Sequence, residues 1–188
     1  TLHTNNAATC LPRLLDMGIE PFLIASTVRA VVGQRLVRRL CQHCKVAYKP
    51  DDATVKTIAQ SFGIKNTDVM QYISKLEERA IAGGIGVTES AASKKMSSSP
   101  KGISSLYKPN PEGCDECNHS GFKGRMGIYE VLDNSPEVQK LIISNATSTV
   151  ISDQAIKEGM VPMLIDGFVK ALRGETTAEE ILRVTAEA

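Results

Sequence analysis

Aromatic residues are scarce in this chain, and neither sign of charge dominates it. Its 188 residues include no tryptophan, and aromatic side chains make up only 4% of the total. A carbohydrate site or a base-stacking RNA platform normally needs more aromatic surface, so both are disfavoured. Lys and Arg number 22 against 21 Asp and Glu, which gives a formal net charge of +1. This balance excludes a strongly basic nucleic-acid coat protein and an acidic tail protein.

Long apolar runs and an initiator methionine are also absent. The longest apolar stretch, residues 21–33, is interrupted by Arg29, and a membrane-spanning helix needs about 20 apolar residues. The first residues show no charged region followed by an apolar one, so the sequence predicts no secretory signal. Because the chain starts at Thr1, we expect it to be a fragment whose upstream part is missing. Hydrophobic residues make up 42%, enough for a folded core.

The spacing of apolar residues predicts a mixture of helices and strands. Residues 6–17 show helical periodicity, with Asn5 or Asn6 as the N-cap and Gly18 just beyond the C-terminal end. The last predicted helix begins with a capping box at residues 177–180. The remaining predicted elements are a strand over residues 126–132 and helices over 51–62, 67–80, 135–142, 147–157 and 162–174.

The segment between Pro21 and Pro50 holds the only charge asymmetry of the chain. A short helix begins at Pro21, and a Val-rich alternation from Arg29 to Leu40 predicts a strand. The segment contains no acidic residue and six basic ones, namely Arg29, Arg35, Arg38, Arg39, Lys45 and Lys49. These side chains form either a solvated strand face or a surface that faces phosphate or an acidic partner subunit.

Composition changes over residues 82–105, where four Gly and seven Ser occur without a periodic apolar pattern. This composition predicts a flexible loop or linker. Its glycines resemble a phosphate-binding loop only weakly, because no Lys-Ser or Lys-Thr pair follows them at P-loop spacing.

Four of the five cysteines form two Cys-x-x-Cys pairs, the first knuckle (Cys41–Cys44) and the second knuckle (Cys114–Cys117). Each pair places two sulfurs on one tight turn, and two such turns form the tetrahedral four-sulfur site of structural Zn²⁺. The spacing therefore favours zinc; free buried thiols and disulfides are the alternatives. Five cysteines are too few for a disulfide scaffold and suit a reducing compartment.

The residues beside these pairs have simpler expected roles. We expect His43 and His119 to be surface residues, because four cysteines already complete the ligand set. Cys10 lies on the apolar stripe of the first helix, where we expect a buried thiol and not a nucleophile. A four-sulfur site leaves no open coordination position, so catalysis at the metal is not expected.

Several short stretches, taken in order, resemble the hexameric motor ATPases of type II secretion and type IV pilus assembly. The resemblance covers nearly the whole chain apart from residues 82–105. The stretches that carry it are Thr1-Leu2-His3-Thr4-Asn5, Arg13-Leu14-Leu15-Asp16-Met17-Gly18, Gln34-Arg35-Leu36-Val37-Arg38-Arg39-Leu40-Cys41, Cys114-Asp115-Glu116-Cys117, Gly121-Phe122-Lys123-Gly124-Arg125, Gly127-Ile128-Tyr129-Glu130, and Gly174-Glu175-Thr176-Thr177 with Glu180, Arg183 and Val184.

The resemblance implies an α/β fold, with this chain as the C-terminal portion of a RecA-like P-loop ATPase domain. In the parent protein, ATP and Mg²⁺ would bind chiefly to Walker motifs upstream of Thr1, so this part alone is not expected to hydrolyse ATP. His3 matches the family's His box near the terminal phosphate, and Thr4 and Asn5 belong to the same box. Arg35, Arg38 and Arg39 are candidates for contacts with nucleotide phosphates or a neighbouring subunit.

Three parts follow from these patterns. Residues 1–40 are expected to complete the ATPase core, and residues 41–125 to form an inserted zinc-ribbon-like subdomain that includes the loop 82–105. Residues 126–188 are expected to form a strand and an all-helical C-terminal subdomain. The tetracysteine subdomain indicates the assembly and secretion branch of the family, since retraction motors usually lack it.

The function implied is that of a hexameric ATPase that powers type IV pilus assembly or type II secretion. Its expected partners are copies of itself and an inner-membrane platform protein, at the cytoplasmic face of the membrane without insertion into it. The alternative is a zinc-ribbon module that binds nucleic acid or protein. The near-neutral charge and the lack of aromatic residues around the knuckles disfavour that alternative, so no nucleic-acid partner is expected.

Overall fold

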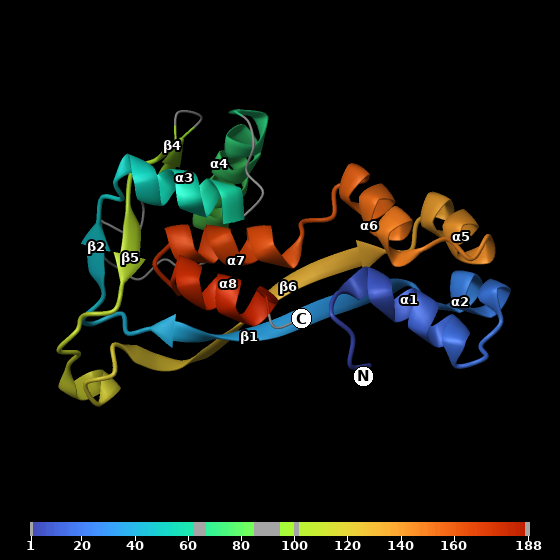
Figure 1. The fold of residues 1–188 in the computed structure, drawn as a ribbon, viewed down its shortest axis with the longest axis horizontal. Coiled ribbons are helices and arrows are strands. Elements are labelled where there is room, and N and C mark those ends of the chain that lie inside the picture. Colours follow the sequence, from blue (N-terminus) through green and yellow to red (C-terminus); the bar gives the residue numbers. More distant parts are fainter. Residues whose placement is uncertain (1, 62–66, 85–94, 100–101, 187–188) are drawn as a thin grey trace. The chain divides into compact units, whose positions relative to one another are not determined.

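The computed structural model describes residues 2–61, 67–84, 95–99 and 102–186 (Figure 1). Contacts between Cα atoms divide the chain into two compact units. Unit 1 comprises Thr1–Arg35 and Ile128–Met163, and unit 2 comprises Leu36–Gly127 and Leu164–Glu187. The mixture of helices and strands agrees with the predicted α/β class. Strands β1 (Ala30–Leu40) and β6 (Phe122–Asp133) pair in a two-stranded sheet, and each strand contributes residues to both units.

Unit 1 contains two helices before β1 and two after β6. They are α1 (Ala7–Asp16), α2 (Pro21–Thr27), α5 (Pro136–Ile143) and α6 (Ser148–Lys157). The predicted cap of α1 is confirmed, because the Asn6 side chain accepts a hydrogen bond from the Thr9 N–H at 2.9 Å. Gly18 follows the helix with φ of +83°, the left-handed conformation expected beyond a helix end.

The core of unit 1 lies where α2 packs on α5 and α1 packs on α6. Asn134, which is buried just after β6, binds carbonyl groups at the C-terminal end of α2. Its Nδ2 donates to the carbonyls of Ala25 at 3.0 Å and Val28 at 2.8 Å. The buried residues of this core are Ala7, Ala8, Leu11, Ile24, Ala25, Leu132, Val138, Ile142, Ile151 and Ala155.

Unit 2 combines helices with two short strand pairs. Its helices are α3 (Asp52–Ser61), α4 (Thr67–Ala82), α7 (Met163–Leu172, from Leu164 onward) and α8 (Ala178–Ala186). Strand β2 (Val46–Tyr48) pairs antiparallel with β5 (Leu106–Lys108), and β3 (Ser98–Ser99) pairs antiparallel with β4 (Gly102–Ile103). Its largest fully buried apolar side chains are those of Leu40, Ile73, Phe168, Leu172 and Ile181.

One expectation differs from this fold, two strands were not expected, and one predicted helix end is not tested. The strand pair β3–β4 lies inside residues 82–105, so the prediction of a flexible loop or linker is wrong there. Residues 85–94 and 100–101 lie outside the described residues. Strands β2 and β5 were not predicted, because three residues are too few to show period-two alternation. The predicted end of the third helix at residue 62 also lies outside the described residues.

The contacts also group the last four helices differently from the all-helical tail that their periodicity predicts. Helices α5 and α6 contact α2 and α1 within unit 1, because their apolar stripes face those helices. Helix α8 and nearly all of α7 belong to unit 2. The boundaries of the two units therefore do not coincide with the ranges 1–40, 41–125 and 126–188.

Candidate metal centre

Two tight turns of unit 2 carry the four paired cysteines. The first knuckle follows β1, and the N–H of Lys45 donates to the carbonyl of Cys41 at 3.0 Å. The second knuckle contains a 3₁₀ turn, η2 (Asp115–Cys117), in which the N–H of Cys117 donates to the carbonyl of Cys114 at 3.1 Å. Each turn therefore presents two sulfurs on one side, as the Cys-x-x-Cys spacing predicts.

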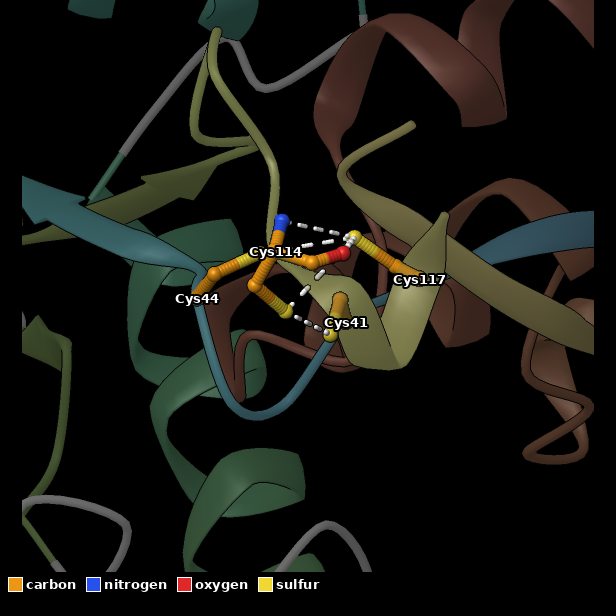
Figure 2. A group of neighbouring side chains, drawn as sticks. All are labelled: Cys41, Cys44, Cys114 and Cys117. Atoms are coloured by element: carbon orange, nitrogen blue, oxygen red, sulfur yellow. Dashed lines mark hydrogen bonds between the residues drawn. The ribbon is translucent and has the colours of Figure 1, made fainter. Parts of the chain in front are cut away.

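The four sulfurs gather into one cluster (Figure 2). The Cys41 Sγ lies 3.7 Å from that of Cys114, which lies 3.7 Å from that of Cys117. The sulfurs of Cys44 and Cys117 are 3.8 Å apart, and all four lie within 4.8 Å of one another. These separations are too long for disulfides, whose sulfurs lie about 2.05 Å apart. A tetrahedral Zn²⁺ with bonds of about 2.3 Å places its sulfurs about 3.8 Å apart, so the cluster fits this ion.

The surroundings of the sulfurs affect their protonation differently. Burial and the neighbouring thiols raise the pKa of Cys44 to about 12. Burial also opposes ionisation of Cys117, but the backbone N–H groups of Cys114 and Gly121, each 3.3 Å from its Sγ, lower its pKa to about 6. A divalent cation favours deprotonation of thiols that bind it, because it compensates the repulsion among their negative charges.

The other cysteine and the two nearby histidines lie outside this cluster, as predicted. His43 and His119 are exposed, and His119 Nε2 lies 3.3 Å from the Asp115 carboxylate. Within the described residues, the group that could hold a metal contains cysteines alone. Cys10 lies in unit 1 and is half-buried, less so than expected, and burial raises the pKa of its thiol.

The turn between α7 and α8 accepts hydrogen bonds from the first knuckle and the residues beside it. Gln42 Nε2 and Lys45 Nζ both donate to the carbonyl of Gly174, at 3.0 Å and 2.9 Å. Lys45 also donates to Gln42 Oε1 at 2.6 Å, and the N–H of Leu40 donates to the carbonyl of Glu175 at 2.8 Å. Burial lowers the pKa of Lys45 to about 8. These contacts tie the first knuckle to a turn more than a hundred residues away.

The residues of the predicted His box belong to unit 1, whereas the four paired cysteines belong to unit 2. His3 is exposed just before α1. Thr4 and Asn5 line a cavity of about 380 Å³ in unit 1, together with apolar side chains that include Leu14 and Val31. The structure therefore brings Thr4 and Asn5 to one cavity.

The three arginines of β1 differ in how far their charges are engaged. Arg38 Nη2 lies 2.5 Å from Glu180 Oε1, and its guanidinium lies 4.2 Å from the centre of the Phe122 ring. Arg35 is half-buried, and Arg39 is exposed. Arg38 and Lys45 thus bind partners inside unit 2, namely the Glu180 carboxylate and the Gly174 carbonyl. These contacts reduce the free positive charge that the segment between Pro21 and Pro50 offers to a phosphate or a partner subunit.

Comparison with known proteins identifies the family. The family model described as "Type II/IV secretion system protein" matches residues 1–183. The chain belongs to this family. The expected resemblance to secretion and pilus motor ATPases is thereby confirmed.

Curated type II/IV secretion system proteins are similar to the chain over nearly all of its length. A type IV pilus assembly ATPase, PilB, of Thermus thermophilus is 36% identical over 187 residues, which are 100% of this chain and 17% of the relative. PilB of Pseudomonas aeruginosa is also 36% identical, over 26% of its length. The type II secretion system ATPase E of Vibrio cholerae is 35% identical, over 29% of its length. The chain thus spans less than a third of these relatives.

The sequence alone did not indicate the contacts of three residues, namely Gln42, Lys45 and Glu130. Gln42 and Lys45 stand within and beside the first knuckle, but nothing in the sequence indicates their contacts with Gly174. Glu130 lies in one of the stretches that carry the family resemblance, and this was its only signal.

The described helices include none with the length and apolar character that a bilayer crossing requires.

Proposed function

We propose that this chain is the C-terminal part of a cytoplasmic, hexameric ATPase that powers type IV pilus assembly or type II protein secretion. The match of the family model over residues 1–183 carries this proposal, and the printed names of the relatives support it. The core to which this part belongs is RecA-like, and the groups that bind the phosphates and Mg²⁺ of ATP lie chiefly in preceding segments of the polypeptide.

The four paired cysteines hold a structural Zn²⁺ in this proposal. Deprotonated Cys41, Cys44, Cys114 and Cys117 bind one ion, whose charge compensates theirs, and the sulfur separations of 3.7 and 3.8 Å support this assignment. Because four sulfurs close the coordination shell, the centre connects two distant segments and does not activate water. It thereby fixes the end of β1 against the start of β6.

The residues before α1 contribute to the nucleotide site of the assembled motor. His3, Thr4 and Asn5 are the candidates, and the position of Thr4 and Asn5 at one cavity supports them. Arg35 and Arg39 remain candidates for contacts with a neighbouring subunit or with phosphate. The motor acts on an inner-membrane platform protein and lies at the cytoplasmic face of the membrane without entering it.

The decisive experiment compares phosphate release by two proteins, the 188-residue chain and the longer native polypeptide that contains it. We expect ATP turnover by the longer polypeptide and only background release by the shorter chain. Turnover that copurifies with the shorter chain, or none by the longer polypeptide with its platform protein present, would contradict the proposal. Binding of duplex DNA that weakens steeply with salt would favour a nucleic-acid module instead.

A further inference from the structure

Glu130 of β6 holds the first residues of two helices with one buried carboxylate. Glu130 is buried, with only 7% of the residue exposed to solvent. Oε1 accepts a hydrogen bond from the N–H of Ala7 at 2.5 Å, and Oε2 accepts one from the N–H of Met163 at 3.2 Å. Ala7 is the first residue of α1, and Met163 is both the first residue of α7 and the last of unit 1.

These contacts explain how a buried carboxylate is tolerated there. Within the described residues, Glu130 forms no ion pair. The first N–H groups of a helix lack partners inside the helix and carry the positive end of its dipole. Each oxygen of Glu130 satisfies one such N–H, so the two helix starts supply the hydrogen bonds that a buried charge requires.

The neighbouring strand leaves room for this carboxylate only because residue 33 is glycine. A Cβ atom at Gly33 would lie 2.8 Å from Cγ and 3.0 Å from Oε1 of Glu130, and 3.2 Å from the Met163 methyl carbon. Even an alanine at this position would displace the Glu130 side chain without removing its charge. Gly33 is therefore part of the arrangement that sets where the carboxylate lies.

Gly33 and Met163, which neighbour the Glu130 side chain, also line the cavity in unit 1. Thr4, Asn5, Ala7, Gly33 and Met163 all line it. The Asn6 side chain caps the first turn of α1, which connects the polar residues before the helix to the N–H that Glu130 binds. Displacement of Glu130 would release the first turn of α1 and with it the position of Thr4 and Asn5.

We propose that Glu130 is a positioning residue that fixes the polar wall formed by Thr4 and Asn5, through its hydrogen bond to the start of α1. This inference rests on the proposed function, in which Thr4 and Asn5 contribute to the nucleotide site. Glu130 itself binds backbone N–H groups and not the nucleotide. Its loss should therefore impair turnover more than nucleotide binding.

The first test measures amide hydrogen exchange at single residues by NMR in the 188-residue chain. We expect exchange of the Ala7 amide, the Met163 amide or both to become about tenfold or more faster in Glu130→Gln, because an amide nitrogen accepts no hydrogen bond. Gly33→Ala should accelerate the same amides with the charge kept, which retains a test if Glu130→Gln fails to fold. Glu137→Gln, at an exposed position, is the control. Unchanged protection of both amides in both test variants would overturn the hydrogen-bonding role.

The second test uses the longer native polypeptide and separates this inference from the proposed function. For Glu130→Gln we expect kcat to fall roughly tenfold or more while KM for ATP changes much less, because misplaced groups impair the reaction more than binding. Glu130→Asp, which keeps the charge, should recover part of the loss. An inactive wild-type polypeptide would overturn the proposed function but not the exchange result. Wild-type kcat in Glu130→Gln would overturn the positioning role alone.

Discussion

Glu180 and Arg38 join α8 to β1 within unit 2 through both the side chain and the backbone. The guanidinium of Arg38 lies 2.5 Å from Glu180 Oε1, and the N–H of Arg38 donates to Glu180 Oε2 at 3.2 Å. Arg183 also contacts both oxygens, at 3.2 and 3.1 Å. The Glu180 side chain is only 4% exposed, whereas that of Arg38 is 53% exposed. A buried carboxylate is thus held by partners at the surface.

The first prediction concerns pH. The hydrogen bond from Arg38, the largest cause, lowers the pKa of Glu180 to about 2 against the effect of burial. Between pH about 4.3, where an unfolded glutamate titrates, and pH about 2, the unfolded chain binds more protons than the folded one. The stability from Glu180 is therefore complete above pH about 4.3 and is lost as pH falls toward 2. It amounts to about 2 kcal/mol after allowance for solvent screening at Arg38.

Urea unfolding of wild type and Glu180→Gln at pH 6, 4 and 3 checks this prediction. The gap in unfolding free energy between the two proteins should narrow as pH falls. The pH dependence that both share, including that of the cysteines, cancels in this difference. Glu137→Gln, at an exposed position, is the control for the loss of a glutamate. A constant gap for Glu180→Gln would show that this carboxylate titrates alike in the folded and unfolded chain.

Glu180 also illustrates how far local sequence patterns determine the fold. The capping box predicted at residues 177–180 forms only in part: Thr177 Oγ1 accepts from the Glu180 N–H at 3.2 Å, but the Glu180 carboxylate binds Arg38. Local rules give the start of α8, because the cap involves neighbours in sequence. They cannot give the partner of Glu180, which lies 142 residues away in the chain.

The metal centre shows the same division between local and distant information. Two Cys-x-x-Cys pairs predict the four-sulfur cluster, because each short spacing fixes a turn and tetrahedral geometry limits how two such turns combine. The support of the first knuckle by Gly174 arises from packing between segments 132 residues apart. The two-residue strands β3 and β4 were equally unpredictable, because their pairing depends on residues too few to form a pattern.

The second prediction is the stoichiometry of the metal. We expect one Zn²⁺ per chain, bound by the four paired cysteines, since their sulfurs already lie at separations that suit a tetrahedral site. Elemental analysis of protein purified without chelator measures it. Cys114→Ser should lower the zinc content strongly, whereas Cys10→Ser should leave it unchanged. Zinc-free wild-type protein, or equal zinc in Cys114→Ser, would contradict the assignment.

The third prediction concerns removal of the metal. Cys41 and Cys114 are 73 residues apart, and closure of such a loop constrains the unfolded chain by several kcal/mol. Hydrogen exchange after chelation should therefore accelerate first in unit 2, around both knuckles and at the turn that binds Gln42 and Lys45. The unit 1 core around Leu11 and Ile142 should stay protected for longer, because its apolar packing involves no cysteine ligand. Equal loss of protection in both cores would show that their stabilities are coupled.

The fourth prediction uses two glycines in the same backbone conformation. Gly174 has φ of +68°, and Gly18 has φ of +83°. A Cβ at Gly174 would lie 2.8 Å from Lys45 Nζ and from the Tyr107 ring, whereas one at Gly18 would meet nothing within 4 Å. Both alanine variants incur about 1 kcal/mol of left-handed strain, and Gly174→Ala should incur a further 1 kcal/mol or more from overpacking. Urea unfolding measures the free energy of unfolding of both variants. Equal destabilisation would mean that the Gly174 contact is easily relaxed.

The last prediction concerns the buried pair Glu77 and Arg173, whose side chains are 0% and 1% exposed. Arg173 Nη1 lies 3.0 Å from Glu77 Oε1, and the same carboxylate accepts hydrogen bonds from the N–H groups of Ser97 at 2.7 Å and Ser98 at 2.9 Å. Removal of one partner leaves the other charge buried without its ion-pair partner. We therefore expect Glu77→Gln and Arg173→Met each to cost about 3 to 5 kcal/mol.

A double-mutant cycle distinguishes this pair from a surface pair. The double variant Glu77→Gln/Arg173→Met buries no charge, so it should lose clearly less stability than the sum of the single losses. The exposed pair Glu137 and Lys140, 3.4 Å apart, is the control, with an expected coupling below about 0.5 kcal/mol. Urea unfolding of wild type and the six variants measures both coupling free energies. A buried coupling as small as that of the control would contradict the burial argument. It would mean that water reaches the Arg173 guanidinium, whose Nε and Nη2 have no hydrogen-bond partner among the described residues.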